Sequence, residues 1–221
     1  MILITGSMGH VGYATVKHAA HRGMSILAQY FQTFRRADAE GISGDVTWVS
    51  CDLTDPIAVS EMCDNFPIEG VIHTAAIPND NMGEPQPRQT FLINAEANVH
   101  LLEQARIKGW RRFLYTSTGS VHQSWRDINK PIPESAWPEP RSLYGITKRC
   151  GEMMVDAYSR TYGVSAASVR LSWVYGPPLV PETFDGPRGP IPYFLKSAVV
   201  GEKVDEPSGA EFAASFTFVE D

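Results

Sequence analysis

A glycine-rich turn close to the start of the chain constrains its fold more than any other feature. Residues 5–12 read Thr-Gly-Ser-Met-Gly-His-Val-Gly, after a short apolar run and at the start of a helix-like segment. Glycines at this spacing allow a tight turn, close approach of a pyrophosphate to the backbone N–H groups, and close helix packing. A tight turn and packing alone are the alternative explanation. The residues expected to bind a dinucleotide here are Gly6, Gly9, His10, Val11 and Gly12.

Short apolar runs alternate with helix-like segments along most of the chain. Strands are expected at residues 1–5, 25–29, 46–50, 70–73, 113–117 and 165–170, and helices at 11–22, 56–64, 88–108 and 143–162. This alternation is typical of βαβ units. We therefore predict an α/β fold with a Rossmann-type doubly wound parallel sheet over residues 1–171, followed by part of a small substrate-binding lobe over 172–221. The last strand-like run, 216–219, leads into no helix, so we expect the chain to be incomplete at its C-terminus.

Composition narrows the possible partners. Acidic residues outnumber basic ones by 25 to 19, which gives a net charge of −6 and argues against binding to nucleic acid. No run approaches the roughly 18 apolar residues of a membrane span, so we expect a cytoplasmic protein. The three cysteines, Cys51, Cys63 and Cys150, show no C-x-x-C spacing. Reduced thiols and no metal site are expected.

The end of the second expected strand bears on the choice of cofactor. A dinucleotide fold usually has a carboxylate there, about 20 residues after the glycine turn, that holds the adenosine ribose. This chain has Gln29-Tyr30 instead, with Arg35 and Arg36 nearby. Without a carboxylate, a 2′-phosphate meets less repulsion and gains a cationic partner. We expect Tyr30 and Arg35 to contact NAD or NADP, with a slight preference for NADP; two solvated arginines are the alternative.

Three polar residues in the middle of the chain suggest proton transfer. Tyr144 and Lys148 lie four residues apart in an expected helix and therefore project from one face. A tyrosine must lose about three pKa units to act as a base near neutral pH, and a nearby ammonium favours the phenolate. Thr118 ends a strand-like run at the edge of the sheet where ligands bind. We predict that Thr118 orients a substrate oxygen while Tyr144 moves its proton; an ordinary Tyr and Lys on a solvated face are the alternative.

These motifs resemble the extended short-chain dehydrogenase/reductase family, the NAD-dependent epimerase/dehydratase group. The resemblance extends over essentially the whole length and includes residues 5–12, 51–55, 73–76, 117–121, 144–148 and 170–177. It implies that Tyr144 is the catalytic acid/base and that Lys148 holds the nicotinamide ribose and lowers the Tyr144 pKa. It also implies a homodimer paired through the two long helices, and further cofactor-site residues: Asp52 and Leu53 at the adenine, Thr74, Ala75 and Ala76 at the phosphates and ribose, and Asn94 in support.

Departures from the family pattern fall on the expected substrate side. His122-Gln123 replace a usual Tyr-Gly, and Trp173 replaces an Asn. Ala214-Ser215 replace an Arg-Asp pair whose Arg commonly binds the diphosphate of a nucleotide sugar in related enzymes. This loss favours a smaller substrate, a free sugar or sugar acid. The candidate substrate residues are His122, Trp173 and Arg188.

The sequence therefore predicts an NAD(P)-dependent oxidoreductase or epimerase that acts by hydride transfer on a carbohydrate-like hydroxyl. One alternative is a nucleotide-sugar 4-epimerase or dehydratase, although Gly119-Ser120 lack the acidic pair that a dehydratase usually adds after the Thr. Another is a dinucleotide-sensing regulator or scaffold without turnover. Such proteins tend to lose the Tyr or the Lys, and both are present here.

Overall fold

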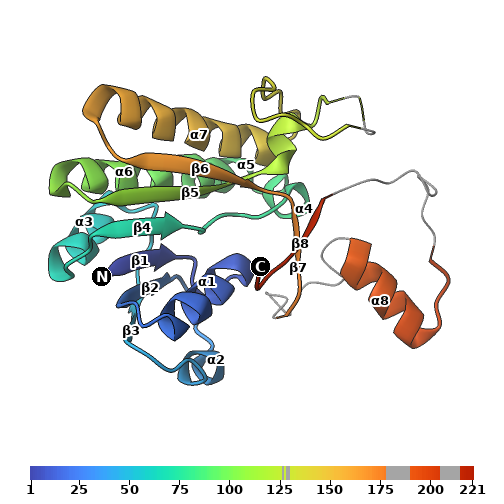
Figure 1. Cartoon of the computed structure of the whole chain (residues 1–221), viewed down its shortest axis with the longest axis horizontal. Helices are drawn as coiled ribbons and strands as arrows, with labels where there is room; N and C mark the ends of the chain where they lie inside the picture. Colours follow the sequence, from blue (N-terminus) through green and yellow to red (C-terminus); the bar gives the residue numbers. More distant parts are fainter. Residues whose placement is uncertain (126, 128–129, 178–189, 205–214) are drawn as a thin grey trace.

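The computed structural model describes residues 1–125, 127, 130–177, 190–204 and 215–221. Its centre is a parallel sheet of six strands in the order β3-β2-β1-β4-β5-β6 (Figure 1). The predicted Rossmann-type fold is confirmed, with the strand order reversing between β1 and β4, where such folds bind their ligands. The strands are β1 (Ile2–Thr5), β2 (Ile26–Tyr30), β3 (Val46–Ser50), β4 (Gly70–His73), β5 (Arg112–Thr118) and β6 (Ala166–Leu171).

Helices cover both faces of this sheet. One face packs against α1 (His10–His21), and the other packs against α3 (Pro56–Asn65), α6 (Ala97–Lys108) and α7 (Leu143–Tyr162). The remaining elements are short: α2 (Arg36–Glu40), α4 (Asp80–Gly83), α5 (Pro87–Phe91), the π-helix η1 (Leu92–Glu96), the 3-10 helix η2 (Gly119–His122), β7 (Trp173–Tyr175), α8 (Pro190–Val200) and β8 (Phe216–Phe218).

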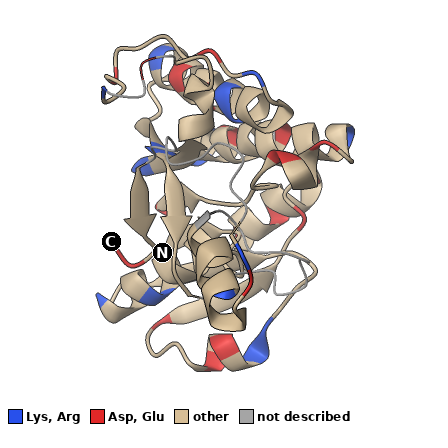
Figure 2. Ribbon diagram, turned by 90° about the vertical axis from the view of Figure 1, so that its right-hand side faces the viewer, with Lys and Arg blue, Asp and Glu red and all other residues tan. Residues whose placement is uncertain are grey.

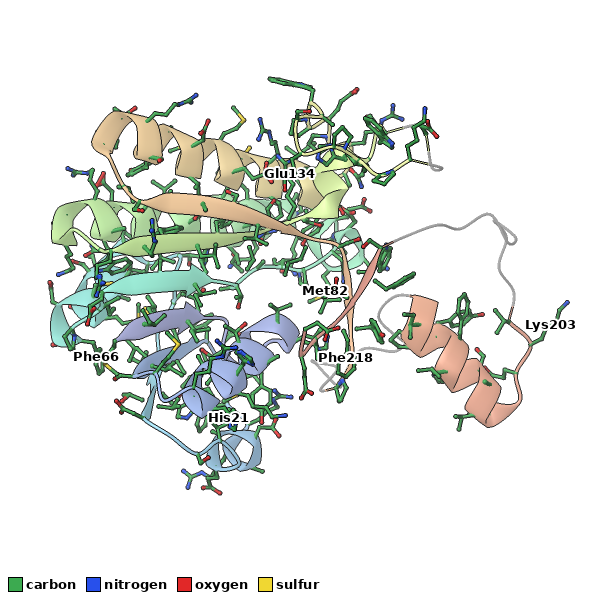
Figure 3. All side chains as sticks on the ribbon, viewed as in Figure 1. His21, Phe66, Met82, Glu134, Lys203 and Phe218 are labelled. Carbon is green, nitrogen blue, oxygen red and sulfur yellow. The ribbon has the colours of Figure 1, made fainter. Side chains whose placement is uncertain are left out.

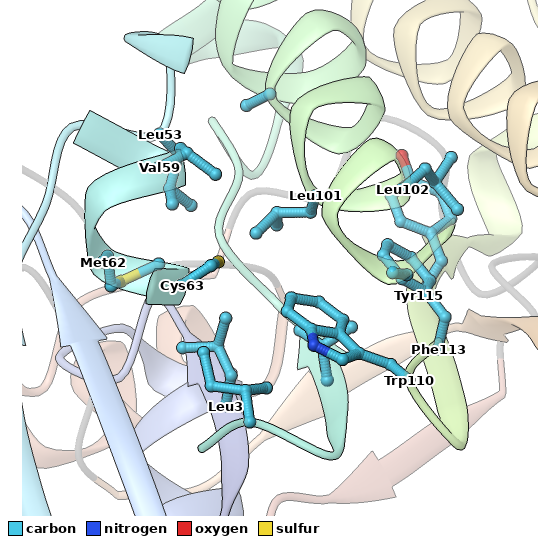
Figure 4. Close-up of a cluster of buried hydrophobic side chains, with 14 of the residues drawn as sticks. Leu3, Leu53, Val59, Met62, Cys63, Leu101, Leu102, Trp110, Phe113 and Tyr115 are labelled. Atoms are coloured by element: carbon cyan, nitrogen blue, oxygen red, sulfur yellow. The ribbon is translucent and has the colours of Figure 1, made fainter. Parts of the chain in front are cut away.

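The larger hydrophobic core lies between the sheet and helices α3, α6 and α7 (Figure 4). Leu101 and Leu102 of α6 are fully buried against Phe113 and Tyr115 of β5. Because α6 turns these side chains inward, they belong to the core. On α7, Met153 is 55% exposed.

Two segments differ in detail from their sequence expectations. The helix expected over residues 88–108 is interrupted by the π-helical turn η1, which contains Asn94. Such turns widen a helix locally and are frequent at functional sites. The strand-like run near the C-terminus forms β8, which pairs in parallel with β7 in a separate two-stranded sheet.

Apart from the buried Lys148 and Glu152, most charged residues of the described chain are partly or fully exposed. In the view of Figure 2, basic and acidic residues are interspersed over the helices, loops and strands. None of the described helices is both long and apolar enough to cross a membrane. Within the described residues, no group of three or more His, Cys, Asp or Glu side chains is arranged to hold a metal ion.

Candidate active site

The glycine turn between β1 and α1 is closed by its own backbone. Gly6 has a left-handed φ of +63°, and Gly9 N–H donates to Gly6 O over 2.8 Å. A Cβ on Gly12 would lie 2.2 Å from Gly6 O, so only glycine fits there. Gly9 caps α1 without a side-chain hydrogen bond, and the first turn of α1 carries no acidic residue. A pyrophosphate therefore fits this turn, where Gly6, Gly9, His10, Val11 and Gly12 lie together.

Gln29 holds the glycine turn from behind. Its side chain is buried, its Oε1 accepts from Gly6 N over 2.9 Å, and its Nε2 donates to Cys51 O over 2.7 Å. One amide thus connects the turn to the end of β3. In the sequence, Gln29 stands out only because a carboxylate is missing there. A polar residue inside the apolar run Ile26–Tyr30 was the available signal.

Arg35 lies against the same turn. Its Nη2 donates to Met8 O over 3.2 Å, its guanidinium lies 5.6 Å from the centre of the Tyr13 ring, and its Nε pairs with Asp38 at 3.0 Å. Tyr30 stacks on Phe34 with ring centres 4.6 Å apart. The structure therefore brings a cation to the end of β2, beside the turn.

The other residues expected at the cofactor follow β3 and β4. Asp52 accepts from the backbone and hydroxyl of Thr54, and Leu53 is buried. Thr74 and Ala75 both donate their backbone N–H groups to the hydroxyl of Thr5, over 3.1 and 3.2 Å. The segment containing Ala76 is thus attached to the strand that leads into the glycine turn, because Thr5 is the last residue of β1.

The Thr5 hydroxyl also determines the state of a buried histidine. It already accepts two backbone hydrogens, so its own hydrogen goes to His73 Nδ1, 2.7 Å away. His73 is therefore neutral and carries its hydrogen on Nε2. Burial, with the charge of Lys148 as a second cause, lowers the pKa of His73 to about 3.

Thr118 and Tyr144 meet at the carboxyl edge of the sheet. Thr118 ends β5 and its hydroxyl accepts from Ser120 N over 3.1 Å, while Tyr144 lies in the first turn of α7. Burial raises the pKa of the Tyr144 phenol, a hydrogen bond with the Thr118 side chain lowers it, and the charge of Asp80 raises it. Thr118 therefore favours the phenolate of Tyr144, whereas burial and Asp80 oppose it.

Lys148 lies one turn further along α7 and is buried. Its Nζ lies 4.3 Å from the centre of the Tyr115 ring, a cation–π contact. Burial lowers the pKa of Lys148 to about 7, opposed by the charge of Glu152. A Cβ on Gly151 would lie 2.2 Å from the Tyr115 hydroxyl, so this glycine lets α7 pack closely over the ring.

Asn94 joins three parts of the site. Its Oδ1 accepts from Ile77 N over 2.8 Å, and its Nδ2 donates to Ile77 O over 3.1 Å and to Thr147 Oγ1 over 3.2 Å. The π-helical turn directs this buried amide between the segment after β4 and helix α7. These bonds make Asn94 a structural support that holds the segment after β4 against α7.

The candidate substrate residues are placed differently from one another. His122 is buried, and its Nε2 lies 3.0 Å from Arg170 Nη1, a guanidinium nitrogen that can only donate. Arg170 also forms two hydrogen bonds with the buried carboxylate of Glu152, over 2.7 and 2.8 Å. Trp173 begins β7 opposite Phe216 and is 45% exposed. Arg188 lies outside the described residues.

Glu152 is a buried ionic residue that the sequence analysis missed. Burial would raise its pKa, but hydrogen bonds from Arg170 and Arg149 lower it below its usual value. Its position, four residues after Lys148 on the same helix face, was the available signal. It fixes the middle of α7 to β6.

Comparisons with known proteins agree with this arrangement. UDP-glucuronate 4-epimerase 6 of Arabidopsis thaliana is 26% identical over 230 residues, covering 100% of this chain and 49% of that protein. GDP-mannose 3,5-epimerase of Arabidopsis thaliana is 26% identical over 231 residues, covering 100% of this chain and 59% of that protein. The crystal structure of UDP-glucose 4-epimerase from Thermotoga maritima with UDP-glucose has a TM-score of 0.87 at 24% identity, covering 99% of this chain and 69% of that one.

The matches cover essentially the whole of this chain but only part of each relative. The chain spans between about half and three fifths of the length of these two curated relatives, which are longer proteins. A family model described as the NAD dependent epimerase/dehydratase family matches residues 2–221. Together with the glycine turn, the Thr118–Tyr144 contact and the buried Lys148, this match shows that the chain belongs to the NAD-dependent epimerase/dehydratase family, within the extended short-chain dehydrogenase/reductase group.

Proposed function

We propose that this chain catalyses oxidation or epimerisation at a hydroxyl-bearing carbon of a carbohydrate. The observation that carries the proposal is the placement of Thr118, the last residue of β5, beside Tyr144, in the first turn of α7, at the carboxyl edge of the sheet. Bound in the glycine turn, NAD or NADP would supply the hydride chemistry at that carbon, either net oxidation or, in an epimerase, removal and return of the hydride. The chain supplies the proton transfer and the positioning.

Each polar residue has a separate part in this reaction. Tyr144, as the phenolate, takes the proton of the substrate hydroxyl, and Thr118 orients the substrate oxygen for that transfer. Lys148, whose pKa of about 7 leaves it partly protonated near neutral pH, holds the ribose and favours the phenolate of Tyr144. The residues around the dinucleotide are Gly6, Gly9, His10, Val11, Gly12, Tyr30, Arg35, Asp52, Leu53, Thr74, Ala75, Ala76 and Asn94.

The test of this proposal is the Tyr144→Phe variant. It removes the proton-transferring oxygen and leaves the ring, so we expect turnover to fall by about 100-fold or more with dinucleotide affinity within twofold of the unaltered chain. Tyr162→Phe, at the exposed end of the same helix, is the matched control. A Tyr144→Phe variant with full activity would contradict the proposal. Dinucleotide binding without turnover on any sugar would favour the sensing or scaffold alternative.

For the substrate, we propose a free sugar or a sugar acid. The support is the replacement of the Arg-Asp pair by Ala214-Ser215 near β8, of which Ala214 lies outside the described residues. Residues 172–221 would form part of the substrate-binding lobe, with His122, Trp173 and Arg188 as candidate contacts. The similarity to a UDP-glucuronate 4-epimerase and a GDP-mannose 3,5-epimerase favours the second candidate, an epimerase of nucleotide sugars such as a 4-epimerase.

Parallel assays distinguish these two substrate classes. Free hexoses and hexuronic acids are compared with the same sugars attached to UDP, at equal concentrations and with NAD and NADP each supplied. Reduction of the dinucleotide or formation of an epimer with the free compounds supports the proposal. Reaction only with the UDP compounds supports the nucleotide-sugar candidate.

For the cofactor, we propose that NADP binds somewhat better than NAD. The family is NAD-dependent, but this chain has Tyr30 at the end of β2 and places Arg35 against the glycine turn. The guanidinium can bind a 2′-phosphate in competition with Asp38. Fluorescence titrations with NADH and NADPH test this: Arg35→Ser should weaken NADPH about 10-fold and leave NADH within twofold. Arg36→Ser, one residue further on, is the control.

We also propose a homodimer, formed through α6 and α7. The support is the exposure of Ile107 at the end of α6 and of Met153 on α7, 64% and 55% respectively. Sedimentation equilibrium of the unaltered chain and of a Met153→Glu variant tests it. A monomer at every concentration for the unaltered chain would contradict the proposal.

A further inference from the structure

Helix α7 carries both Tyr144 and Lys148, so the place where it begins determines where the phenol lies. The first N–H groups of any helix lack partners within the helix and need others. Ser142 supplies one, because its Oγ accepts from Gly145 N over 3.1 Å. Gln123, after η2, and Asp80, in α4, bind further backbone N–H groups at the start of α7.

Gln123 holds the chain just before α7. Its Oε1 accepts from the backbone N–H groups of Arg141 and Ser142, over 2.7 and 2.8 Å, and its Nε2 donates to Ser142 Oγ over 3.0 Å. One amide thus fixes two successive backbone groups and the capping hydroxyl. Gln123 directly follows η2, the short helix that Thr118 caps. Gln123 therefore connects the end of η2 to the start of α7.

Asp80 holds the first turn of α7 from α4. Its Oδ1 accepts from Tyr144 N over 2.9 Å. A carboxylate is also the favoured charge at a helix N-terminus. Tyr144 itself is thus fixed through its backbone by a residue 64 positions earlier in the chain.

Little space remains between α7 and η2. A Cβ on Gly145 would lie 2.9 Å from Ser120 O and 3.2 Å from Gln123 Oε1. Helix α7 can therefore approach η2 only because Gly145 has no side chain. Movement of α7 along or away from η2 would alter the Thr118–Tyr144 contact directly.

We propose that Gln123 and Asp80 are positioning residues that hold the first turn of α7 and thereby place the Tyr144 phenol against the Thr118 hydroxyl. This proposal rests on the proposed function, in which Tyr144 moves a proton. Gln123 stands where the family usually has a glycine, so the support it gives is particular to this chain. Both residues hold the start of α7 by hydrogen bonds, and the charge of Asp80 in addition raises the pKa of the Tyr144 phenol.

Paired substitutions test the proposal. Gln123→Met keeps the length of the side chain and removes its hydrogen bonds, whereas Gln123→Glu keeps an oxygen that accepts from Arg141 and Ser142. Asp80→Ala and Asp80→Asn form the equivalent pair, since asparagine keeps the accepting oxygen. Gln86→Met removes a side-chain bond to Met82 O on the exposed surface and serves as the control.

The first readout is turnover with the substrate found for the unaltered chain. Gln123→Met and Asp80→Ala should lower kcat about 10- to 100-fold with the KM for the dinucleotide within twofold, because the phenol is displaced and the glycine turn is not. Gln123→Glu and Asp80→Asn should restore kcat to within about threefold. Equal loss in both members of a pair, or wild-type kcat in Gln123→Met and Asp80→Ala, would overturn the proposal.

The second readout is independent of activity. Amide hydrogen exchange of the whole chain should speed up at Tyr144 and Gly145 in Gln123→Met and Asp80→Ala, and stay unchanged there in the Gln86→Met control. Unchanged exchange in the first turn of α7 would overturn the positioning role. If exchange changes as expected but no sugar is turned over, Gln123 and Asp80 do hold the first turn of α7, and it is the proposed function that is contradicted.

Discussion

The two ends of the candidate active site are formed by different kinds of groups. The cofactor end, around the glycine turn, is made of backbone and of glycines that leave no room for a Cβ. The catalytic end, around the start of α7, is made of buried polar side chains, among them Lys148, Glu152 and Asn94. The first is therefore sensitive to added volume, and the second to lost hydrogen bonds and charges.

The two ends meet at Thr5 and His73. Thr5 holds the segment after β4 beside the glycine turn, and His73 lies between Thr5 and the Tyr115 ring that carries the Lys148 ammonium. A second positive charge beside Lys148 is avoided because His73 stays neutral. The comparison therefore predicts different responses to substitution at each end and a pH response at the junction.

Adding one methyl group should damage the cofactor end most. In Gly12→Ala, the new Cβ would lie 2.2 Å from Gly6 O and 2.7 Å from Thr74 Oγ1, both in the turn or its neighbour. Relief requires the turn to move, and we expect dinucleotide affinity to fall about 100-fold with a loss of about 3 kcal/mol in unfolding free energy. Titration with NADH and urea unfolding measure these effects.

The control for that variant is Gly41→Ala. Gly41 has a φ of −75°, and its Cβ would come no closer than 3.4 Å to any atom. Its affinity for the dinucleotide should equal that of the unaltered chain. Equal affinity in Gly12→Ala would show that the turn does not depend on the missing side chain, and the contrast between the two ends would fail.

Removing one charge should damage the catalytic end without changing its volume. Glu152→Gln leaves the partly exposed guanidinium of Arg170 without its buried carboxylate partner, which should cost about 1–3 kcal/mol. The loss is measured as the unfolding free energy in urea. Glu103→Gln, which breaks the exposed pair with Arg106, should leave the unfolding midpoint unchanged. Equal effects of the two variants would contradict the distinction between buried and exposed pairs.

The parts of the site formed by backbone and glycines could be predicted from the sequence, whereas contacts between polar side chains of distant segments could not. The glycine turn was predicted from spacing because a backbone cradle requires glycine at fixed positions, and Tyr144, Lys148 and Thr118 followed from helix and strand periodicity. The interruption of the 88–108 helix by a π-helical turn was not predicted, because its cause is tertiary: Asn94 bonds to Ile77 and Thr147.

Long-range polar contacts were beyond the sequence for the same reason. Asp80 and Tyr144 are 64 positions apart, and no local pattern joins a residue after β4 to the first turn of α7. Gln29 and Gln123 were noted as departures from a usual pattern, but their partners are backbone groups of other segments. A departure shows where a chain differs; only the fold shows what the new side chain holds.

The junction between the two ends should make the fold acid-sensitive. His73 has a pKa of about 3 in the fold against 6.5 when exposed, so the unfolded chain binds the extra proton first as the pH falls. Stability is full above pH 6.5 and is lost below it, by roughly 3 kcal/mol between pH 6.5 and 4. Urea unfolding across this range should show the loss, and His73→Asn should remove it.

The control for the junction is His21→Asn. His21 lies at the exposed end of α1 (Figure 3), and it should keep the acid response of the unaltered chain. An unchanged pH slope in His73→Asn would mean that other groups cause the acid response. Protonation of His73 would then not be the cause of the loss of unfolding free energy at low pH.

The smallest effect is expected from removing the Tyr115 hydroxyl, because the ring of Tyr115, and not its hydroxyl, contacts the Lys148 ammonium. Tyr115 donates to Asn94 O at 3.3 Å and to Lys148 O at 3.5 Å, both long, while its ring lies under the Lys148 ammonium at 4.3 Å. Tyr115→Phe removes the hydroxyl and keeps the ring, so it should cost about 1 kcal/mol of unfolding free energy and leave turnover within threefold. Tyr115→Leu removes the ring as well and should impair turnover much more, because Lys148 loses the face on which it rests. Equal turnover in the two variants would show that the catalytic end depends on volume, like the cofactor end, and not on the placement of its charges.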